Sequence, residues 1–265
     1  MTEPDFDLGA DAYRRRIDVV IVDDTTVRCA LQDDFHHFVV TVQHDQRVVV
    51  GVVADSIRWP WAACPSAATA LQSLIGMPLS ERFTAASRYA NASHNCTHQF
   101  DAAAHAITHV VAVAQGRRVS DRRYDVEVSA ILQAEAGQPK RNRLWVDGLS
   151  DLSWTMQPRA LVDPQPPFDA APWKGGFMRW ADSELDPESA ERAIVLRRAC
   201  DIGMGRGMDL DAVPQAGELL NIMSGVCYTM QPDIAPGSAR NVGNIRDFAA
   251  HPERLDPLSL ERAGE

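Results

Sequence analysis

The sequence lacks the segments that would place a chain in or across a membrane. No run among its 265 residues approaches the ~20 consecutive apolar residues that a membrane-spanning helix requires. Its first residues, MTEPDFDLGADAYRRR, contain no apolar stretch of the kind found in secretory signals. We therefore expect a cytoplasmic protein with no membrane partner.

Cysteine and basic residues are also scarce. The five cysteines are an odd and scattered set, which suits a reducing compartment better than a disulfide scaffold. The chain has 26 Lys and Arg against 36 Asp and Glu, a formal net charge of −10, which argues against a protein that mainly grips phosphate backbones. Nucleotide-binding loops, zinc ribbons and standard nucleophile motifs are missing. We expect no nucleic-acid partner and no cofactor.

Segments rich in Val and Ile predict strands in the first part of the chain. They are residues 16–22, 27–42 and 47–59. Short polar links at residues 23–26 and 44–46 predict hairpins between them, and therefore an antiparallel meander. The polar sequence Asp33-Asp34-Phe35-His36-His37 interrupts the second segment and marks a strand junction.

Strand patterns return after the middle of the chain, and helical patterns accompany both halves. Residues 124–132, 143–146 and 152–156 predict further strands. Because one apolar face of these strands needs cover, we expect residues 124–156 to extend the sheet begun by residues 16–59. The predicted helices are residues 66–75, 97–114, 187–203 (entered through Asp186) and 214–229.

These elements together predict an α+β fold in which an antiparallel sheet packs on the long amphipathic helix 97–114, with additional C-terminal helices. We expect residues 1–265 to form a single domain. Within it, residues 13–115 form an α+β unit and residues 116–157 add strands. Residues 158–265 form a Pro-rich arm followed by the C-terminal helices.

An ordered set of short motifs in the first half resembles the family named domain of unknown function 2889. The motifs are Arg15-Arg16-Ile17, Leu31-Gln32-Asp33-Asp34-Phe35-His36-His37, Ile57-Arg58-Trp59-Pro60 followed by Cys64, Leu74-Ile75-Gly76, and Asn95-Cys96-Thr97-His98. The resemblance covers about residues 13–115. It implies a compact α+β unit and no particular activity, because the family is named for lacking one.

Two cysteines and two histidines form the first candidate constellation: His37, Cys64, Cys96 and His98. Such a set can bind zinc, but structural zinc sites normally contain close pairs such as C-x-x-C, and Cys96-x-His98 is the only tight pair here. The same residues also suit a polar catalytic or binding cluster, or buried structural thiols with satisfied histidines. We expect no stoichiometric zinc or iron.

A stripe of polar residues follows one side of the predicted helix 97–114. It consists of His98, Asp101, His105 and His109, and it is interpreted either as a water-exposed face or as a pocket wall or helix interface. Asp101 beside His98 or His105 is the arrangement that orients an imidazole for general-base work.

The remaining candidates suit an oxygenated aromatic ligand. Arg58 lies at the end of a predicted strand, next to Trp59 and Trp61. Its guanidinium can bind an anionic group of a ligand while the two tryptophans cover the ligand's aromatic ring. The tyrosine in Gly225-Val226-Cys227-Tyr228 offers a hydroxyl donor, although a satisfied core tyrosine fits equally. At the strand junction, Asp34 and His36 offer further polar contacts.

The sequence therefore favours a cofactor-independent lyase or isomerase that acts by acid–base chemistry on a small hydrophobic, aromatic, oxygenated compound, for example with loss of formaldehyde or CO₂. His37 or His98 is the expected base, Arg58 the anion clamp and Tyr228 a donor. The expected substrate contacts are Trp59, Trp61, Asp34, His36, Cys64, Cys96 and Asp101. The alternatives are a non-catalytic small-molecule binding or assembly protein, with a possible homodimer, and a zinc or iron protein that uses the Cys and His ligands.

Overall fold

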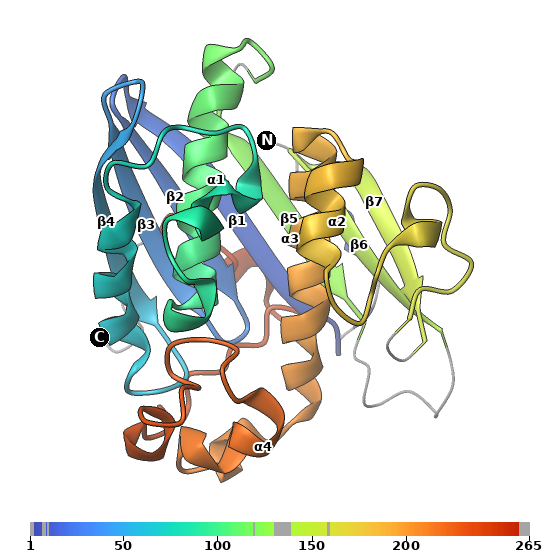
Figure 1. Cartoon of the computed structure of the whole chain (residues 1–265). Coiled ribbons are helices and arrows are strands. Elements are labelled where there is room, and N and C mark those ends of the chain that lie inside the picture. The colour runs from blue at the N-terminus through green and yellow to red at the C-terminus, as the bar shows by residue number, and fades with distance from the viewer. Residues whose placement is uncertain are drawn as a thin grey trace. The chain divides into compact units, whose positions relative to one another are not determined.

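The computed structural model describes residues 3–6, 9, 11–118, 120–129, 139–157 and 160–259. It has a seven-stranded sheet with the strand order β4-β3-β2-β1-β5-β6-β7 (Figure 1). The strands are β1 (Tyr13–Asp23), β2 (Thr26–Asp33), β3 (His37–His44), β4 (Val49–Arg58), β5 (Arg122–Val128), β6 (Lys140–Val146) and β7 (Leu149–Met156). The strand order confirms that residues 124–156 extend the sheet begun by residues 16–59.

Helices of two kinds accompany the sheet, so the fold is α+β as predicted. The α-helices are α1 (Thr97–Ala114), α2 (Phe177–Glu184), α3 (Pro187–Gly203) and α4 (Leu220–Met223). The 3₁₀ helices are η1 (Cys64–Leu74), η2 (Phe83–Arg88), η3 (Ala92–His94), η4 (Phe168–Ala170), η5 (Met204–Gly207), η6 (Leu210–Ala212), η7 (Ala216–Leu219), η8 (Ala235–Gly237) and η9 (Pro252–Arg254).

The contacts between residues divide the chain into two compact units. The first unit comprises Met1–Arg16, Arg123–Met208 and Asp247–Leu255. The second comprises Ile17–Arg122, Asp209–Arg246 and Asp256–Glu265. Each unit is therefore assembled from segments that are far apart in the sequence. The single domain expected for residues 1–265 stays a prediction.

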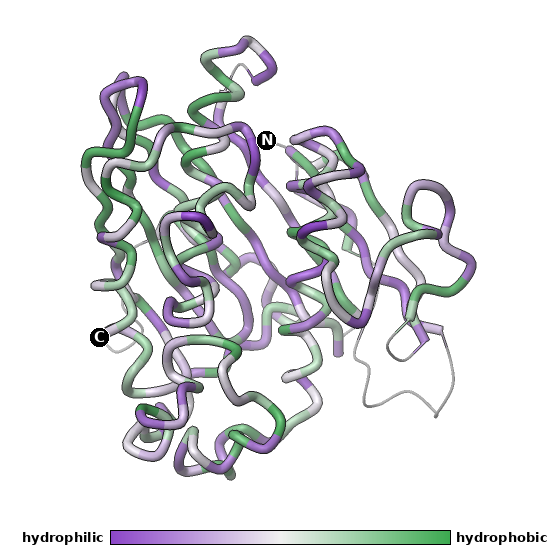
Figure 2. Tube along the Cα trace, viewed as in Figure 1, coloured by the Kyte–Doolittle hydropathy of each residue, from purple (hydrophilic) through white to green (hydrophobic). Residues whose placement is uncertain are grey.

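In the second unit, an antiparallel meander carries the long helix. Strand β2 pairs with β3, and β3 with β4, in antiparallel register. Helix α1 has the bounds predicted from its apolar spacing, and it packs on β2 and β3. Figure 2 shows hydrophobic residues along these strands and α1, and hydrophilic residues at the hairpin ends. This pattern is the one expected for a core between a sheet and an amphipathic helix.

The polar side of α1 is covered rather than exposed. Of its 18 residues, 14 are buried, including His98, Asp101, His105 and His109. Segments η1, η2 and η3 contact the helix and account for this burial. For example, the ring of Phe83 in η2 lies 4.7 Å from the ring of His105, centroid to centroid. The interpretation of the stripe as a water-exposed face is therefore wrong, because buried polar groups need partners from the protein.

The first unit contains the other meander and two helices. Strand β6 pairs with β5 and with β7, both in antiparallel register. Helix α3 has the predicted bounds, and its capping residue Asp186 accepts hydrogen bonds from the N–H groups of Glu188 and Ser189. The predicted strand 124–132 ends at Val128 in β5, and its last three residues lie outside the described part of the chain.

Two helix predictions differ from the structure in type or extent, and one helix was missed. The helix predicted over residues 66–75 is present as the 3₁₀ helix η1, which spans residues 64–74. Helix α2 was not predicted at all. The helix expected over residues 214–229 is reduced to η7 and the short α4, because Gly217 packs directly against the backbone of Pro236 and Gly225 adopts a φ of 74°. Tertiary contacts have replaced regular structure there.

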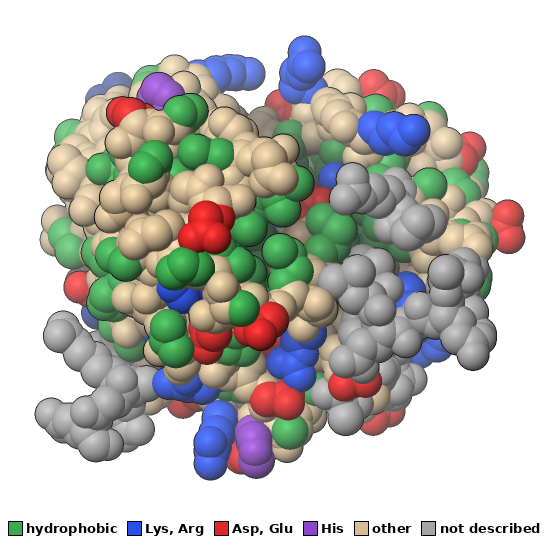
Figure 3. Space-filling model, turned by 90° about the horizontal axis from the view of Figure 1, so that it is seen from below, with side chains coloured by type: hydrophobic (Ala, Val, Ile, Leu, Met, Phe, Trp, Pro, Cys, Tyr) green, Lys and Arg blue, Asp and Glu red, His purple; other side chains and the backbone are tan. Residues whose placement is uncertain are grey.

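Among the described residues, no helix is long and apolar enough to cross a membrane. On the face that Figure 3 shows, basic and acidic side chains are interspersed over an otherwise mixed surface.

Candidate functional site

A four-residue turn between β2 and β3 carries the candidate site. Gln32 of β2 pairs with His37 of β3, so Asp33 to His36 form the reversal between them. The N–H of Asp33 donates to the carbonyl of His36 at 2.9 Å and closes the turn. The carboxylate oxygen Oδ1 of Asp33 accepts from the N–H groups of Phe35 and His36, at 2.9 and 2.8 Å. An aspartate at the start of a turn commonly bonds the backbone two and three residues later.

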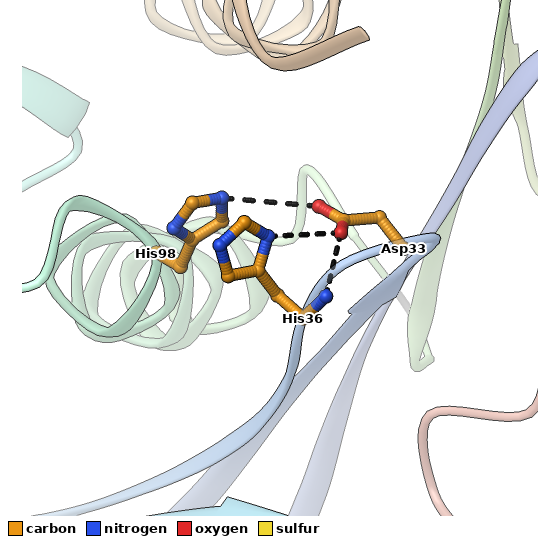
Figure 4. Close-up of side chains that lie close together, drawn as sticks. All are labelled: Asp33, His36 and His98. Carbon is orange, nitrogen blue, oxygen red and sulfur yellow. Dashed lines mark hydrogen bonds and ion pairs between the residues drawn. The ribbon is translucent and has the colours of Figure 1, made fainter. Parts of the chain in front are cut away.

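The same carboxylate faces two imidazoles (Figure 4). Nδ1 of His36 lies 2.9 Å from Oδ1 of Asp33, and Nε2 of His98 lies 3.8 Å from Oδ2. The two imidazole rings stack with centroids 3.7 Å apart. The side chain of Asp33 is fully buried, whereas those of His98 and His36 are 8% and 12% exposed. The cluster therefore lies at the edge of the core, with His36 its most accessible member.

The turn into β3 and the start of α1 bring these side chains together. His36 directly precedes β3, and Phe38 of that strand lies beside both imidazoles. The ring centroid of Phe38 is 5.9 Å from that of His36 and 6.1 Å from that of His98. His98 is in the first turn of α1, the helix that packs on this face.

Two imidazoles and one carboxylate lie in contact at this site, with the ring centroids 3.7 Å apart. Such a set can accept a proton at one ring and donate one from the other, which is the division that acid–base sites use.

Arg58 holds the backbone of the turn. One terminal nitrogen of its guanidinium donates to the carbonyl oxygens of Asp33 and His36. The other donates to the carbonyl oxygens of Asp34 and of Asn244, a residue of the C-terminal segment. The side chain is buried. Four contacts with carbonyls occupy most of the five N–H groups that an arginine offers.

His37 points away from the cluster. Its Nε2 lies 2.9 Å from the carbonyl oxygen of Pro257, so an Nε2–H donates to that oxygen. Burial lowers the pKa of His37, and the nearby charge of Arg58 lowers it further. The structure thus places His37 beside Arg58 and the C-terminal segment, and it places His36 beside His98.

Cys64 and Cys96 lie near the start of α1, and both are buried thiols. Burial raises the pKa of Cys64 to about 11 and also raises that of Cys96. The hydroxyl of Thr229 donates to Sγ of Cys64 at 3.4 Å, and the N–H of Tyr228 donates to the carbonyl of Asn95. The predicted residues Cys64, Cys96 and Tyr228 therefore come from distant segments to one end of α1.

The other predicted contacts are spread around the turn. Trp61 is buried, and the guanidinium of Arg240 lies 5.4 Å from its ring centroid. Trp59 is half-buried and its carbonyl accepts from the side chain of Asn241. Asp34 is buried and its carbonyl accepts from the N–H of Arg246. Asp101 is buried in α1.

Asp33, His36 and His98 are also the residues that could hold a metal ion. In the described part of the chain, they alone form a group of three His, Cys, Asp or Glu residues whose ligand atoms lie within 4.8 Å of one another. Two imidazoles and one carboxylate are a known set for divalent transition metals. In this structure Nδ1 of His36 is hydrogen-bonded to the carboxylate of Asp33 instead.

Asp33 is the member of the site that the sequence reasoning missed. The polar junction was recognised, but Asp34 was chosen as the contact residue. The available signal was the spacing Asp33-x-Phe35-His36, because an aspartate that begins a tight turn directs its carboxylate to the following N–H groups.

A separate cavity lies in the first unit. It has a volume of about 280 Å³ and is lined by residues of β7 and of the Pro-rich segment after it, including Leu152, Trp154, Val162 and Phe168. None of the predicted site residues lines it.

Comparison with known families supports the resemblance stated above. Residues 11–112 match the family described as "Protein of unknown function (DUF2889)", close to the expected range of 13–115. The match includes the turn, Arg58 and α1 up to Ala112, and the remainder of the chain extends beyond it. No curated protein matches the chain.

Proposed function

We propose that the protein is a cofactor-independent lyase or isomerase that acts by acid–base chemistry on a small hydrophobic, aromatic, oxygenated compound. The observation that carries this proposal is the buried carboxylate of Asp33, which bonds Nδ1 of His36 at 2.9 Å while His98 stacks on the same ring. A carboxylate on one imidazole nitrogen fixes the tautomer and makes the other nitrogen a base.

Each residue of the cluster takes a defined role in the proposal. His36 is the general base through Nε2, Asp33 orients it, and His98 is the partner that returns the proton. The base is assigned to His36 rather than His37, because Nε2 of His37 is engaged by the carbonyl of Pro257. Arg58 is assigned a positioning role, because its guanidinium holds the turn.

Aromatic side chains surround His36. The rings of Phe35 and Phe38 flank it, with centroids 6.1 and 5.9 Å from its own. Both rings are buried, so they form the apolar surroundings of the imidazole. Trp59, Trp61 and Tyr228 stay as predicted contacts for the ligand.

For loss of formaldehyde, the reaction balances without another reactant. His36 removes the hydroxyl proton of a –CH₂OH group, the C–C bond to the aryl-bearing carbon breaks, and formaldehyde leaves. The electron pair remains on the aryl-bearing carbon and is delocalised into the substrate. The proton passes from His36 to His98, and the imidazolium of His98 then protonates that carbon. For loss of CO₂, the bond to the carboxylate carbon breaks, CO₂ leaves and the electron pair stays on the same carbon. The imidazolium of His98 protonates that carbon and regains its proton from water.

A single probe, 3-hydroxy-2-phenylpropanoate, tests these outcomes together. In D₂O, loss of formaldehyde gives phenylacetate, loss of CO₂ gives 2-phenylethanol, and proton exchange at the central carbon gives a racemised, deuterated acid. The neutral 2-phenylpropane-1,3-diol tests whether the acid group matters. NMR of the reaction mixture identifies each product.

We expect His36→Ala and Asp33→Asn to lower turnover by about two to four decades, the usual contribution of an acid–base group. The exposed His94 provides the control, because His94→Ala removes an imidazole outside the cluster. Equal loss in all three variants would contradict the proposed roles, as would turnover retained by both site variants.

Metal analysis tests the alternative use of the same cluster. After dialysis against a chelator, we expect turnover to persist. Turnover that disappears with the chelator and returns with one equivalent of a divalent metal would instead assign Asp33, His36 and His98 as metal ligands. A cytoplasmic location, a small-molecule partner and a homodimer stay proposals alongside the function.

A further inference from the structure

We propose that Asn244 is a positioning residue for His36, supplied by the part of the chain beyond the matched family region. The inference rests on the proposed function and deepens it. It assigns a role in the site to the C-terminal segment, which includes residues 240–246.

Asn244 contacts the turn directly. Its side chain is buried, and its Nδ2–H donates to the carbonyl of Phe35 at 2.7 Å. Its own carbonyl accepts from Arg58 at 2.8 Å. Two residues later, the N–H of Arg246 donates to the carbonyl of Asp34 at 2.8 Å. The C-terminal segment therefore runs against the turn that carries the Asp33–His36 pair.

Asn244 completes the set of bonds to the turn carbonyls. Arg58 donates to the carbonyl oxygens of Asp33, Asp34 and His36. The remaining carbonyl of the turn, that of Phe35, accepts from Asn244. All four carbonyls of the turn thus have a donor, as buried backbone groups require.

The hydrogen bond from Asn244 is made to the peptide unit between Phe35 and His36. The carbonyl of Phe35 and the N–H of His36 belong to the same planar peptide unit. One end of that unit accepts from Asn244, and the other donates to Oδ1 of Asp33 at 2.8 Å. Rotation of this peptide would break both bonds and move the carboxylate relative to the imidazole of His36. Asn244 therefore fixes the geometry of the pair without touching it.

The same segment provides a matched control. Asn241 is three residues away and also uses its side-chain amide to donate to a backbone carbonyl, that of Trp59, at 3.0 Å. Asn241→Ala thus removes the same kind of bond from the same segment but leaves the turn intact. A general loss of stability would affect both variants alike.

The test combines amide exchange with the ring signals of His36. In Asn244→Ala, we expect the amide proton of His36 to exchange about tenfold faster, the factor that the loss of one hydrogen bond allows. The Nδ1–H signal of His36 should shift toward that of a weaker bond to Asp33, with the amides of α1 unchanged. With 3-hydroxy-2-phenylpropanoate, kcat should fall while KM stays constant. Asn241→Ala should change none of these.

Several results would overturn the proposal. Ring and amide signals of His36 that stay at their wild-type values in Asn244→Ala would contradict it, as would an equal change of these signals in Asn241→Ala. If Asn244→Ala does not fold, Asn244→Asp keeps the shape and removes the donor, and unfolding of both variants makes Asn244 a purely structural residue. The NMR result holds even when no turnover is found, so it separates this proposal from the proposed function.

Discussion

Neighbouring residues of the strand junction have opposite surroundings, and the difference follows from strand geometry. His36 faces α1 and stacks on His98, whereas His37 turns to the carbonyl of Pro257. The sequence shows that polar groups gather at this junction. It does not show which of two adjacent histidines faces the helix, because the choice depends on the length of the turn, and a shift of one residue exchanges the faces.

The pKa of His37 predicts how stability changes with pH. Burial lowers this pKa below 6.5, so the folded state keeps His37 neutral at a pH where the unfolded chain takes up a proton. The unfolded state then binds more protons, and the free energy of unfolding decreases as the pH falls below about 6.5. The stability that neutral His37 contributes is fully present above that pH. It is lost as the pH falls from about 6.5 to the lower pKa of His37 in the folded state.

Urea unfolding at pH 7.5 and 5.5 measures this effect. We expect the decrease between the two pH values to be smaller in His37→Gln, which keeps an amide donor toward Pro257 without a titrating group. His44 also has a lowered pKa through burial and contributes to the wild-type decrease, so the difference between the two proteins isolates His37. An identical decrease in both proteins would show that His37 does not titrate differently on folding.

At the scale of elements, the sequence predicts the helix boundaries that depend on neighbouring residues. It does not predict those that depend on contacts with distant segments. Helix α3 starts at a capping aspartate followed by proline, and α1 follows its apolar spacing, so both bounds were predicted. By contrast, the segment after Pro214 has a helical pattern in sequence. In the structure its residue Tyr228 donates to the carbonyl of Asn95, a contact that no local pattern contains.

The cap of α3 provides a prediction at this scale. Asp186 accepts from two N–H groups of the first turn, so Asp186→Ala leaves both without that acceptor. We expect the free energy of unfolding to fall by about 1 kcal/mol, the usual cost of losing a capping side chain. Asp186→Asn retains a capping oxygen and should cost much less in the same urea titration. Equal losses in both variants would assign the effect to the negative charge instead.

At the scale of the whole molecule, buried arginines connect segments that are distant in sequence. In the first unit, Arg14 of β1 donates to the carboxylate of Glu127 in β5 and to the carbonyl of Phe248. Both side chains of this ion pair are almost completely buried. The sequence does not show that Arg14, Arg15 and Arg16 are all buried in β1. Acceptors such as Glu127 and Phe248 lie 113 and 234 residues away from Arg14 along the chain.

This buried pair predicts an asymmetry between single and double substitutions. Glu127→Gln leaves the charge of Arg14 buried without its counterion, so we expect a loss of about 3 kcal/mol in the free energy of unfolding. The double variant Arg14→Met with Glu127→Leu removes both charges and should be more stable than Glu127→Gln. Chemical unfolding of the two variants and the wild-type protein decides the order. A double variant less stable than the single one would contradict it.

The most direct test of the site is the tautomer of His36 in the wild-type protein. The account requires a neutral imidazole at pH 7.5 with its proton on Nδ1, bonded to Asp33, and with Nε2 free of a proton. Long-range ¹H–¹⁵N correlation spectra of the ¹⁵N-histidine-labelled protein, assigned with His36→Ala, distinguish the two nitrogens. A protonated Nδ1 and an unprotonated Nε2 are predicted. A proton on Nε2 alone, or on both nitrogens at that pH, would contradict the assignment of His36 as the base.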